Sequence, residues 1–502
     1  MVTGLAFWLL ATIARRAEFS GGIADGYIYL LMADAFAGIA QGIDPFSRTV
    51  FANFPFPPLY PLVLALGGGS YFPLATHALH AGLLTVGLSA FACWYRTLGL
   101  SWVRSAVLAF TVVLLPVTWL TALDIQSEAL YLLLSALSLL ALGDGQLSRK
   151  RWLVCGVCCG LTILTRTIGI ALLPALLVHA VRVKQSREGG LAIGIALLAP
   201  LTWIGLRQSV GQQSSYIDAS HGALQSSLAA YWPVVAQNVQ ALWSAVLRCF
   251  DFAPHSSTLV VLGGMGSIAS VTALYRGWRG RADAAYLLSY LAIILLWPYP
   301  AHARRFLFVL LPILFAYAVL GISACVKART AWVRGAVAYA VIVILILLAL
   351  PTTVSMWRDL KQEPVLARMP SRYLAPSLAT ARSDTDGLAP IYELLATLPA
   401  EVPSGGCVSS VIPEQLMFYT RRRGAALAES RGDATRLRRM LMNCPYVFMI
   451  ATTAYPADGL PPMYPYRVVA ADLDVLAVRR ANPKDIHSAV MAMLAYYRPA
   501  KK

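Results

Sequence analysis

The chain has 502 residues, of which 58% are hydrophobic and 13% are charged. A soluble domain carries about 25% charged residues, so this composition excludes an ordinary soluble protein. The formal net charge of +17 would suit a nucleic-acid partner, but the basic residues stand in short gaps between apolar runs, where they indicate membrane topology. The sequence therefore predicts a polytopic α-helical membrane protein that binds no nucleic acid.

The first apolar stretch, Val2 to Ala14, is short for a membrane span. We expect either a short helix or a true start further upstream, because the basic region and the cleavage site of a signal peptide are both poor. Residues 15–57 then form a polar, aromatic-rich segment. A short amphipathic helix that begins near Ala24 is predicted to lie at the membrane surface.

Apolar runs that approach a membrane thickness continue up to residue 352. They lie at 72–94, 103–121, 126–143, 151–165, 167–182, 190–206, 257–275, 283–298, 306–325 and 333–352. The segment 58–69 is too short to cross a membrane, and we expect it to dip into the membrane or to form the foot of the next helix. With the first stretch these runs make about eleven spans, so residues 1–352 are expected to form a transmembrane body.

Five short gaps between these runs hold fourteen basic residues against three acids. The basic residues are Arg96 and Arg104; Arg149, Lys150 and Arg151; Arg182, Lys184 and Arg187; Arg276, Arg279 and Arg281; and Lys327, Arg329 and Arg334. The positive-inside rule places these gaps in the cytoplasm. Residues 15–57, 121–126, 207–256 and 298–305 then lie on the outer side, together with the chain beyond residue 352.

The chain beyond residue 352 is polar, and its first part, 353–380, is rich in proline and reads as a linker. Residues 381–502 alternate helical and strand patterns, which predicts a small α/β domain on the outer side. The predicted strands are 407–411, 425–428, 446–451, 466–470 and 475–478, and the predicted helices are 386–398, 413–419 and 434–442. Cys407 and Cys444 could pair there, because the outer side is oxidising.

Asp25 is the first candidate for chemistry, because a carboxylate at the lipid boundary can act in acid–base catalysis. In a helix that begins near Ala24 it shares a face with Tyr29 and Met32, whereas Asp34 lies on the opposite face. Asp25 and Asp34 are therefore not expected to form a carboxylate pair. Asp before an apolar run is also a favoured helix cap, and this alternative stays open.

Asp124 and Glu128 stand four positions apart at the predicted outer mouth of a span, where they would share one helical face. An ionisable group inside a span is by default a functional hypothesis, which favours a catalytic role. Two acids in a first turn also complement the positive end of a helix, and this is the structural alternative.

Three basic residues are candidates for binding phosphate, whose oxygens accept bidentate bonds from guanidinium groups. Arg166 stands between two short predicted helices. Arg304 and Arg305 stand at another outer mouth, where basic residues are uncommon. The alternatives are an ion pair of Arg166 with one of the acids and interfacial snorkelling of Arg304 and Arg305.

Other polar residues have a structural interpretation. The Cys-x-x-Cys-Cys run at 155–159 contains glycine and favours close helix packing over zinc binding. His77, His80 and His179 stand singly in apolar helices and are interpreted as core residues, so no metal site is predicted. The arginines at 421–423 are interpreted as a solvated face, with contact to lipid headgroups as the alternative.

These features, in this order and on these sides of the membrane, resemble the GT-C superfamily of polyprenyl-phosphate-sugar glycosyltransferases. The resemblance is to its protein O-mannosyltransferase-like and aminoarabinose lipid A transferase-like bacterial members, over roughly residues 20–330. The landmarks are Asp25 with Tyr29, Gly42 to Pro45, Pro57 to Pro61, Ser127 with Glu128, Leu164 to Arg166, and Arg305 and Phe306 with Pro312. The chain departs from the pattern at Gly26, where many relatives have a second acid, and at Phe306, where Tyr is common.

The resemblance implies an enzyme that moves a sugar from a polyprenyl-phosphate donor to a lipid, glycan or protein acceptor on the outer face of a bacterial inner membrane. The resemblance implies that Asp25 acts as general base on the acceptor or orients it, with Asp124 or Glu128 as second acid. It also implies Arg166, Arg304 and Arg305 on the departing phosphate, and Tyr29 and Tyr60 in the substrate site. No cofactor is named, and dependence on a divalent cation stays open. The alternative functions are a transporter or flippase, or a polymerase or ligase, for polyprenyl-linked glycans.

Overall fold

The computed structural model describes residues 2–14, 24–38, 46–47, 50, 56–209, 228–250, 256–297, 302–326, 331–362, 402–403, 405–410, 413–426, 435, 439, 443–444, 446–450 and 475–478. By compactness the chain divides into two units. The membrane unit comprises Met1–Gly21 and Ala52–Glu363, and the polar unit comprises Gly22–Phe51 and Pro364–Lys502. The segment around Asp25 therefore groups with the C-terminal part of the chain.

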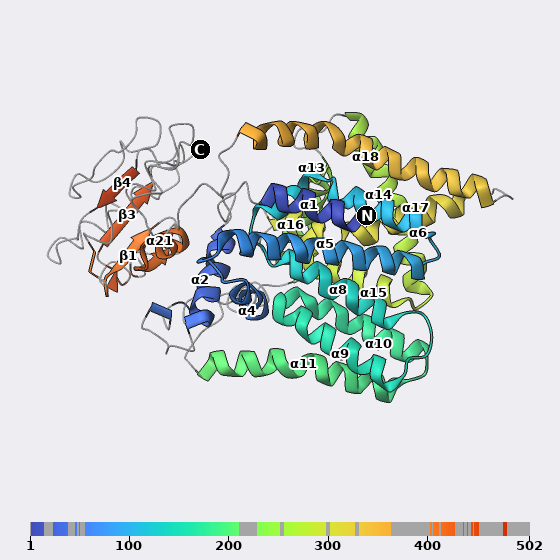
Figure 1. The fold of residues 1–502 in the computed structure, drawn as a ribbon. Coiled ribbons are helices and arrows are strands. Elements are labelled where there is room, and N and C mark those ends of the chain that lie inside the picture. Colours follow the sequence, from blue (N-terminus) through green and yellow to red (C-terminus); the bar gives the residue numbers. More distant parts are fainter. Residues whose placement is uncertain are drawn as a thin grey trace. The chain divides into compact units, whose positions relative to one another are not determined.

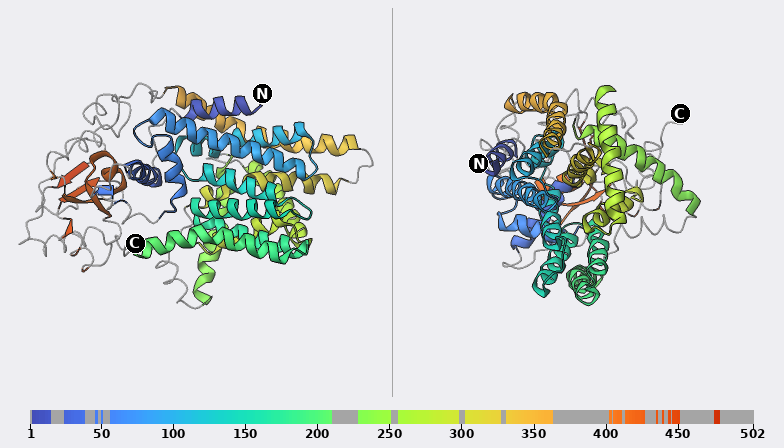
Figure 2. Two further views of the ribbon diagram at one scale, coloured as in Figure 1. Left: turned by 60° about the horizontal axis from the view of Figure 1, so that its bottom comes forward. Right: turned by 90° about the vertical axis from the view of Figure 1, so that its right-hand side faces the viewer.

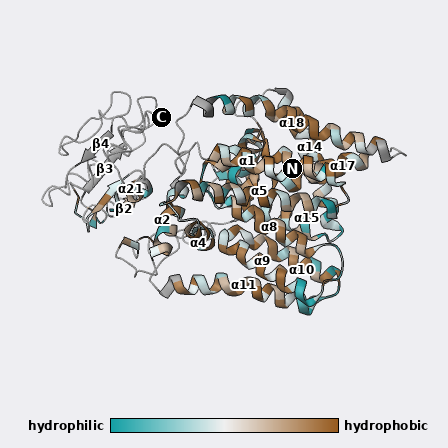
Figure 3. Cartoon of the chain, viewed as in Figure 1, coloured by the Kyte–Doolittle hydropathy of each residue, from teal (hydrophilic) through white to brown (hydrophobic). Residues whose placement is uncertain are grey.

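Helices make up the described part of the membrane unit (Figure 1). They are α1 (Val2–Ala14), α4 (Leu59–Leu66), α5 (Pro73–Thr97), α6 (Trp102–Val113), α7 (Pro116–Leu123), α8 (Glu128–Leu142), α9 (Arg149–Thr165), η2 (Thr167–Ala171), α10 (Leu172–Arg182), α11 (Ser186–Ser209), α13 (Leu228–Arg248), α14 (Ser256–Trp278), α15 (Ala282–Leu295), α16 (Ala303–Phe308), α17 (Leu311–Cys325) and α18 (Ala331–Gln362). Most of the long helices run in similar directions. The left panel of Figure 2 shows them from the side, and the right panel shows them nearer end-on. Apolar residues follow most of their length (Figure 3).

Several of these helices have the length and composition of membrane spans. Within the described residues four are long and apolar enough to cross a membrane, namely α5, α11, α14 and α18, and the bent pair of α6 and α7 makes up to five. Shorter apolar helices of 10–17 residues include α1, α8, α15 and α17. Each predicted apolar run from 72 to 352 coincides with a helix or a helix pair. The predicted helical membrane protein is confirmed, and α18 continues to Gln362, beyond the expected start of the linker.

Small residues let α9 and α11 approach closely. A Cβ atom added at Gly156 would lie 2.6 Å from the carbonyl oxygen of Ala192, and one added at Gly160 would lie 3.0 Å from that of Ala196. The cysteines of the run at 155–159 lie in α9, and Cys155 is buried. This geometry agrees with the packing interpretation of residues 155–159.

An elbow, bent by 62°, joins α6 to α7. A helix break leaves carbonyl groups without helical partners, and three side chains donate hydrogen bonds to such carbonyls at the elbow. They are Thr118 to Val112 at 2.5 Å, Trp119 to Val113 at 3.0 Å, and Thr353 of α18 to Leu114 at 2.7 Å. The elbow fixes the direction of α7, whose last residue immediately precedes Asp124.

The described strands of the polar unit form one sheet in the order β2-β1-β3-β4. They are β1 (Cys407–Ser410), β2 (Arg423–Ala426), β3 (Tyr446–Ile450) and β4 (Val475–Val478), with α21 (Pro413–Thr420) between β1 and β2. β1 is parallel to β2 and β3, and β4 is antiparallel to β3. These positions agree with the predicted pattern, whereas the predicted segments 386–398 and 466–470, and most of 434–442, lie outside the described residues.

The helix that carries Asp25, α2 (Ala24–Gly38), packs against α21 within the polar unit. Arg421 donates to Asp34 at 2.5 Å, and the ring centroid of Tyr27 lies 5.0 Å from that of Phe418. Tyr27 and Asp34 are seven positions apart and share one face of α2, opposite that of Asp25. The predicted separation of the two carboxylates is confirmed. The interpretation of Arg421 as solvated is wrong, because its partner carboxylate is buried.

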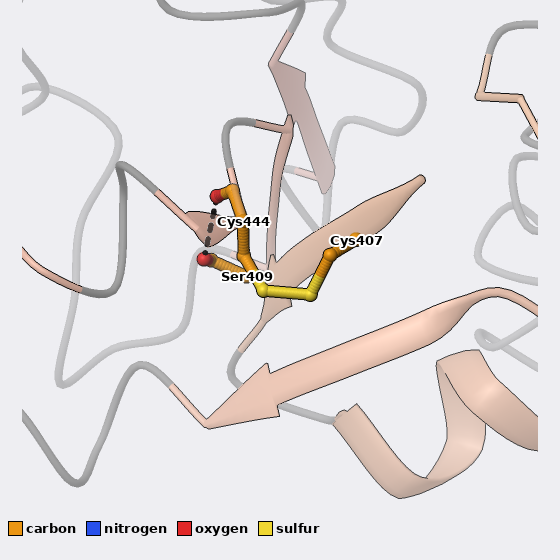
Figure 4. The surroundings of a disulfide bond; sticks show 3 residues. All are labelled: Cys407, Ser409 and Cys444. Carbon is orange, nitrogen blue, oxygen red and sulfur yellow. Dashed lines mark hydrogen bonds between the residues drawn. A yellow bond between two sulfur atoms is a disulfide. The ribbon is translucent and has the colours of Figure 1, made fainter. Parts of the chain in front are cut away.

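Cys407 and Cys444 form a disulfide that joins β1 to the segment just before β3 (Figure 4). The Ser409 hydroxyl donates to the carbonyl oxygen of Cys444 at 3.0 Å, which adds a second link between the same segments. Disulfides persist in oxidising compartments. The pairing that the sequence allows for Cys407 and Cys444 is therefore present in the structure.

Replacing both Cys407 and Cys444 by Ser is expected to destabilise the polar unit, because the bond closes a loop with a sequence separation of 37, worth about 4 kcal/mol in the chain-entropy model. The measurement is thermal unfolding of the purified protein, followed by limited proteolysis of the C-terminal part. Cys93→Ser, which removes an exposed free thiol, is the control and should change neither readout. Equal stability of the double variant and the control would contradict the assignment.

Candidate functional site

A buried carboxylate in the membrane unit, Glu128, binds two guanidinium groups. Arg305 Nε lies 2.8 Å from Glu128 Oε1 and its Nη2 lies 3.4 Å from Oε2, while Arg166 Nη1 forms an ion pair with Oε1. The side chain of Glu128 is 1% exposed, and those of Arg166 and Arg305 are 12% and 10% exposed. These three residues, the Glu128 cluster, carry two positive charges and one negative charge. Their net positive charge suits an anion.

Two members of the Glu128 cluster, Glu128 and Arg166, stand where a helix begins or breaks, and the third lies in a short helix. Glu128 opens α8, where a negative charge complements the helix dipole. Arg166 separates α9 from η2 with an extended backbone, φ −151° and ψ 134°. Arg305 lies in α16, a helix of six residues. The two short apolar runs predicted on either side of Arg166 correspond to this break.

An aromatic ring supports Arg166. Its Cζ atom lies 5.0 Å from the centroid of the Phe306 ring, a cation–π contact that holds a guanidinium group in place. Phe306 meets Trp297 edge-on at 5.6 Å. Asn238 of α13 donates to the carbonyl oxygens of Leu295 and Trp297 at 3.0 and 2.7 Å. The Phe that departs from the family pattern is thus a support for one of the two cations.

Tyr60 lies in α4, and its hydroxyl lies 2.9 Å from Nδ1 of His80 on α5. Nε2 of His80 lies 2.7 Å from the carbonyl oxygen of Thr121 at the end of α7. A carbonyl only accepts, so Nε2 carries the proton and Nδ1 accepts from Tyr60. His80 is buried as predicted, and it also connects the foot of α4 to the helix that leads to Asp124.

Asp124 is buried and accepts a hydrogen bond from Gln126 Nε2 at 3.0 Å. It follows α7 in an extended conformation, whereas Glu128 is the first residue of α8. The prediction that Asp124 and Glu128 share one helical face is wrong, because the backbone is not helical between them. Both acids nevertheless belong to the same connection between two helices.

The remaining predicted residues are Arg304, Asp25 and Tyr29. Arg304 is half-buried on α16, next to Arg305 in the chain. Asp25 is partly exposed and Tyr29 is buried, one turn apart on α2 of the polar unit. Asp25 is the second residue of α2 and lies inside the first turn, where it complements the helix dipole.

Within the described residues no group of three or more His, Cys, Asp or Glu side chains could hold a metal ion. Both carboxylate oxygens of Glu128 face guanidinium groups. A cation bound at Glu128 would also meet two positive charges. This carboxylate therefore does not suit a metal ligand.

No protein-family model and no curated protein matches the chain. Among solved structures, ArnT from Cupriavidus metallidurans in the apo state has a TM-score of 0.51 at 14% identity, over 94% of this chain and 96% of that chain. The chain shares the fold of ArnT. This likeness agrees, at the level of the fold, with the resemblance drawn from the sequence.

Two further solved structures are similar to the chain. ArnT from Cupriavidus metallidurans bound to undecaprenyl phosphate has a TM-score of 0.46 at 16% identity, over 95% of this chain and 97% of that chain. The archaeal oligosaccharyltransferase AglB from Archaeoglobus fulgidus was solved in complex with an inhibitory peptide and a dolichol-phosphate. It has a TM-score of 0.49 at 12% identity, over 89% of this chain and 69% of that chain.

Proposed function

We propose that the protein is a membrane glycosyltransferase that moves a sugar from a polyprenyl-phosphate donor to an acceptor on the outer face of a bacterial inner membrane. The Glu128 cluster carries the proposal, because one buried carboxylate holds two guanidinium groups together. Negative charge grows on a departing phosphate, and preorganised cations stabilise it. ArnT, whose fold the chain shares, has been solved with undecaprenyl phosphate bound, which supports this class of donor.

The reaction exchanges one bond at the anomeric carbon of the sugar. A nucleophilic oxygen or nitrogen of the acceptor gives its proton to the Asp25 carboxylate and attacks the anomeric carbon on the side opposite the phosphate. The bond from that carbon to the phosphate oxygen breaks, and its electron pair leaves with the polyprenyl phosphate. The configuration at the carbon is inverted.

The residues of the membrane unit serve the leaving group. Arg166 and Arg305 stabilise the phosphate, and Arg304 adds a third positive charge from the same short helix. Glu128 acts as a positioning residue, because its oxygens hold both guanidinium groups. Asp124 is assigned as the second acid of the site, and Tyr60 of α4 as a substrate-binding residue.

We further propose eleven spans, with the polar unit on the outer side. Each predicted apolar run coincides with a helix or helix pair, and an odd number of crossings takes the chain from the cytoplasm to the outside. The disulfide of the polar unit supports this side. In this organisation residues 15–57 form the first outer loop, and residues 381–502 form an extracytoplasmic α/β domain.

Transfer from labelled polyprenyl-phosphate sugars in membranes that contain the protein tests this function. We expect the label to move to a new product, and Arg305→Gln to lower the rate by about 100-fold or more, because one preorganised charge at a developing anion is worth that much. Arg279→Gln, which removes an exposed arginine directly after α14, is the matched control and should keep full activity. Absence of transfer from every such donor would refute the function.

A further inference from the structure

Tyr290 of α15 is fully buried, and its hydroxyl has no hydrogen-bond partner among the residues that the structure describes. Its neighbours Tyr131 and Tyr286 face each other instead, with their hydroxyl oxygens 3.1 Å apart. The ring centroids of Tyr131 and Tyr286 lie 6.0 and 5.8 Å from that of Tyr290. A buried hydroxyl without a partner is destabilising and requires an explanation.

The position of Tyr290 explains this hydroxyl, because its helix, α15, contacts the segments that form the Glu128 cluster. α15 packs against α8, which Glu128 opens, and against η2, which directly follows Arg166. Tyr131, whose ring neighbours that of Tyr290, lies one helical turn after Glu128 on α8.

We propose that Tyr290 donates a hydrogen bond to the phosphate group of the bound donor, as a third donor beside Arg166 and Arg305. The inference rests on the proposed function and names a residue of the same site. A phenol can donate where a phosphate oxygen only accepts. The net positive charge of the Glu128 cluster favours an anionic oxygen over a neutral sugar hydroxyl. The hydroxyl is thus unsatisfied in the free protein and satisfied in the complex.

This role predicts opposite effects of Tyr290→Phe on stability and on binding. The free protein should melt at the same temperature or higher, because the variant removes a buried polar atom that has no partner. Binding of the phosphate should weaken by about 10-fold or more, because a hydrogen bond to a charged group is lost. The measurement is the melting temperature in detergent without ligand and across a titration with undecaprenyl phosphate. A parallel titration with inorganic phosphate distinguishes a lipid phosphate from a free one.

Tyr317→Phe is the matched control, because Tyr317 is another buried tyrosine, on α17, next to Arg276. It should leave the affinity for undecaprenyl phosphate unchanged. Failure of the wild-type protein to bind undecaprenyl phosphate would overturn the proposed function together with this inference. Wild-type binding that Tyr290→Phe retains in full would overturn the inference alone. A lower melting temperature of ligand-free Tyr290→Phe would also overturn the inference alone, because the hydroxyl would then already have a hydrogen-bond partner in the free protein.

Discussion

Asp25→Asn is expected to lower the rate of sugar transfer by about 100-fold or more, because an amide keeps the shape of the carboxylate but cannot take a proton from the acceptor. The measurement is a single-turnover transfer rate with purified protein at saturating donor. If Asp25 only complemented the dipole of α2, the change would cost about 0.3–1 kcal/mol of stability, and transfer per folded molecule would be unchanged. Full activity of the variant would rule out the catalytic role.

Asp34→Asn is the matched control, because it makes the same chemical change on the opposite face of the same helix. Asp34 pairs with Arg421 of the polar unit, so its loss should lower the melting temperature while the rate per folded molecule stays high. Asp25→Asn should give the reverse pattern, with normal melting and lost transfer. The two variants together separate a role in chemistry from a role in folding.

Glu128→Gln is expected to give the largest loss of stability in the membrane unit. The change leaves two buried guanidinium groups without their shared carboxylate, and removal of one partner from a buried ion pair costs about 3–5 kcal/mol. The measurement is thermal unfolding in detergent, together with the yield of folded protein. An unchanged melting temperature would show that Arg166 and Arg305 find other partners.

A second change should recover part of that stability. Glu128→Gln combined with Arg166→Gln keeps the net charge of the wild-type cluster, so the double variant should melt above the single variant. Asp144→Asn is the control, because Asp144 forms an ion pair with Arg281 at 2.6 Å but its side chain is 56% exposed. Exposed pairs contribute about 0–1 kcal/mol, so this variant should melt near the wild type.

The helices and strands could be predicted from the sequence because both depend on local periodicity. Glu128, Arg166 and Arg305 could also be identified as candidates, since a charge inside an apolar chain is costly and therefore informative. Their mutual contacts could not be predicted. Glu128 and Arg305 are 177 positions apart, and no local pattern encodes which acid binds which base.

Two predictions from the sequence, the shared helical face of Asp124 and Glu128 and the solvation of Arg421, are wrong for the same reason. The stretch from Asp124 to Glu128 contains neither Gly nor Pro, so the sequence carries no signal for the break between α7 and α8. Arg421 sits in a run of three arginines that reads as solvated, but its partner Asp34 lies 387 positions earlier. Its backbone φ of 55° is also rare for an arginine. Tertiary contacts decided both positions.

The elbow between α6 and α7 has a consequence for biosynthesis. The carbonyl oxygen of Leu114 at this elbow accepts a hydrogen bond from Thr353, which is translated 239 positions later. In a hydrocarbon environment an uncovered carbonyl is costly, so the elbow reaches its final state only after the last helix of the membrane unit has inserted. Because α7 leads directly to Asp124, a ribosome-bound chain that stops before α18 would hold the candidate site in an incomplete form.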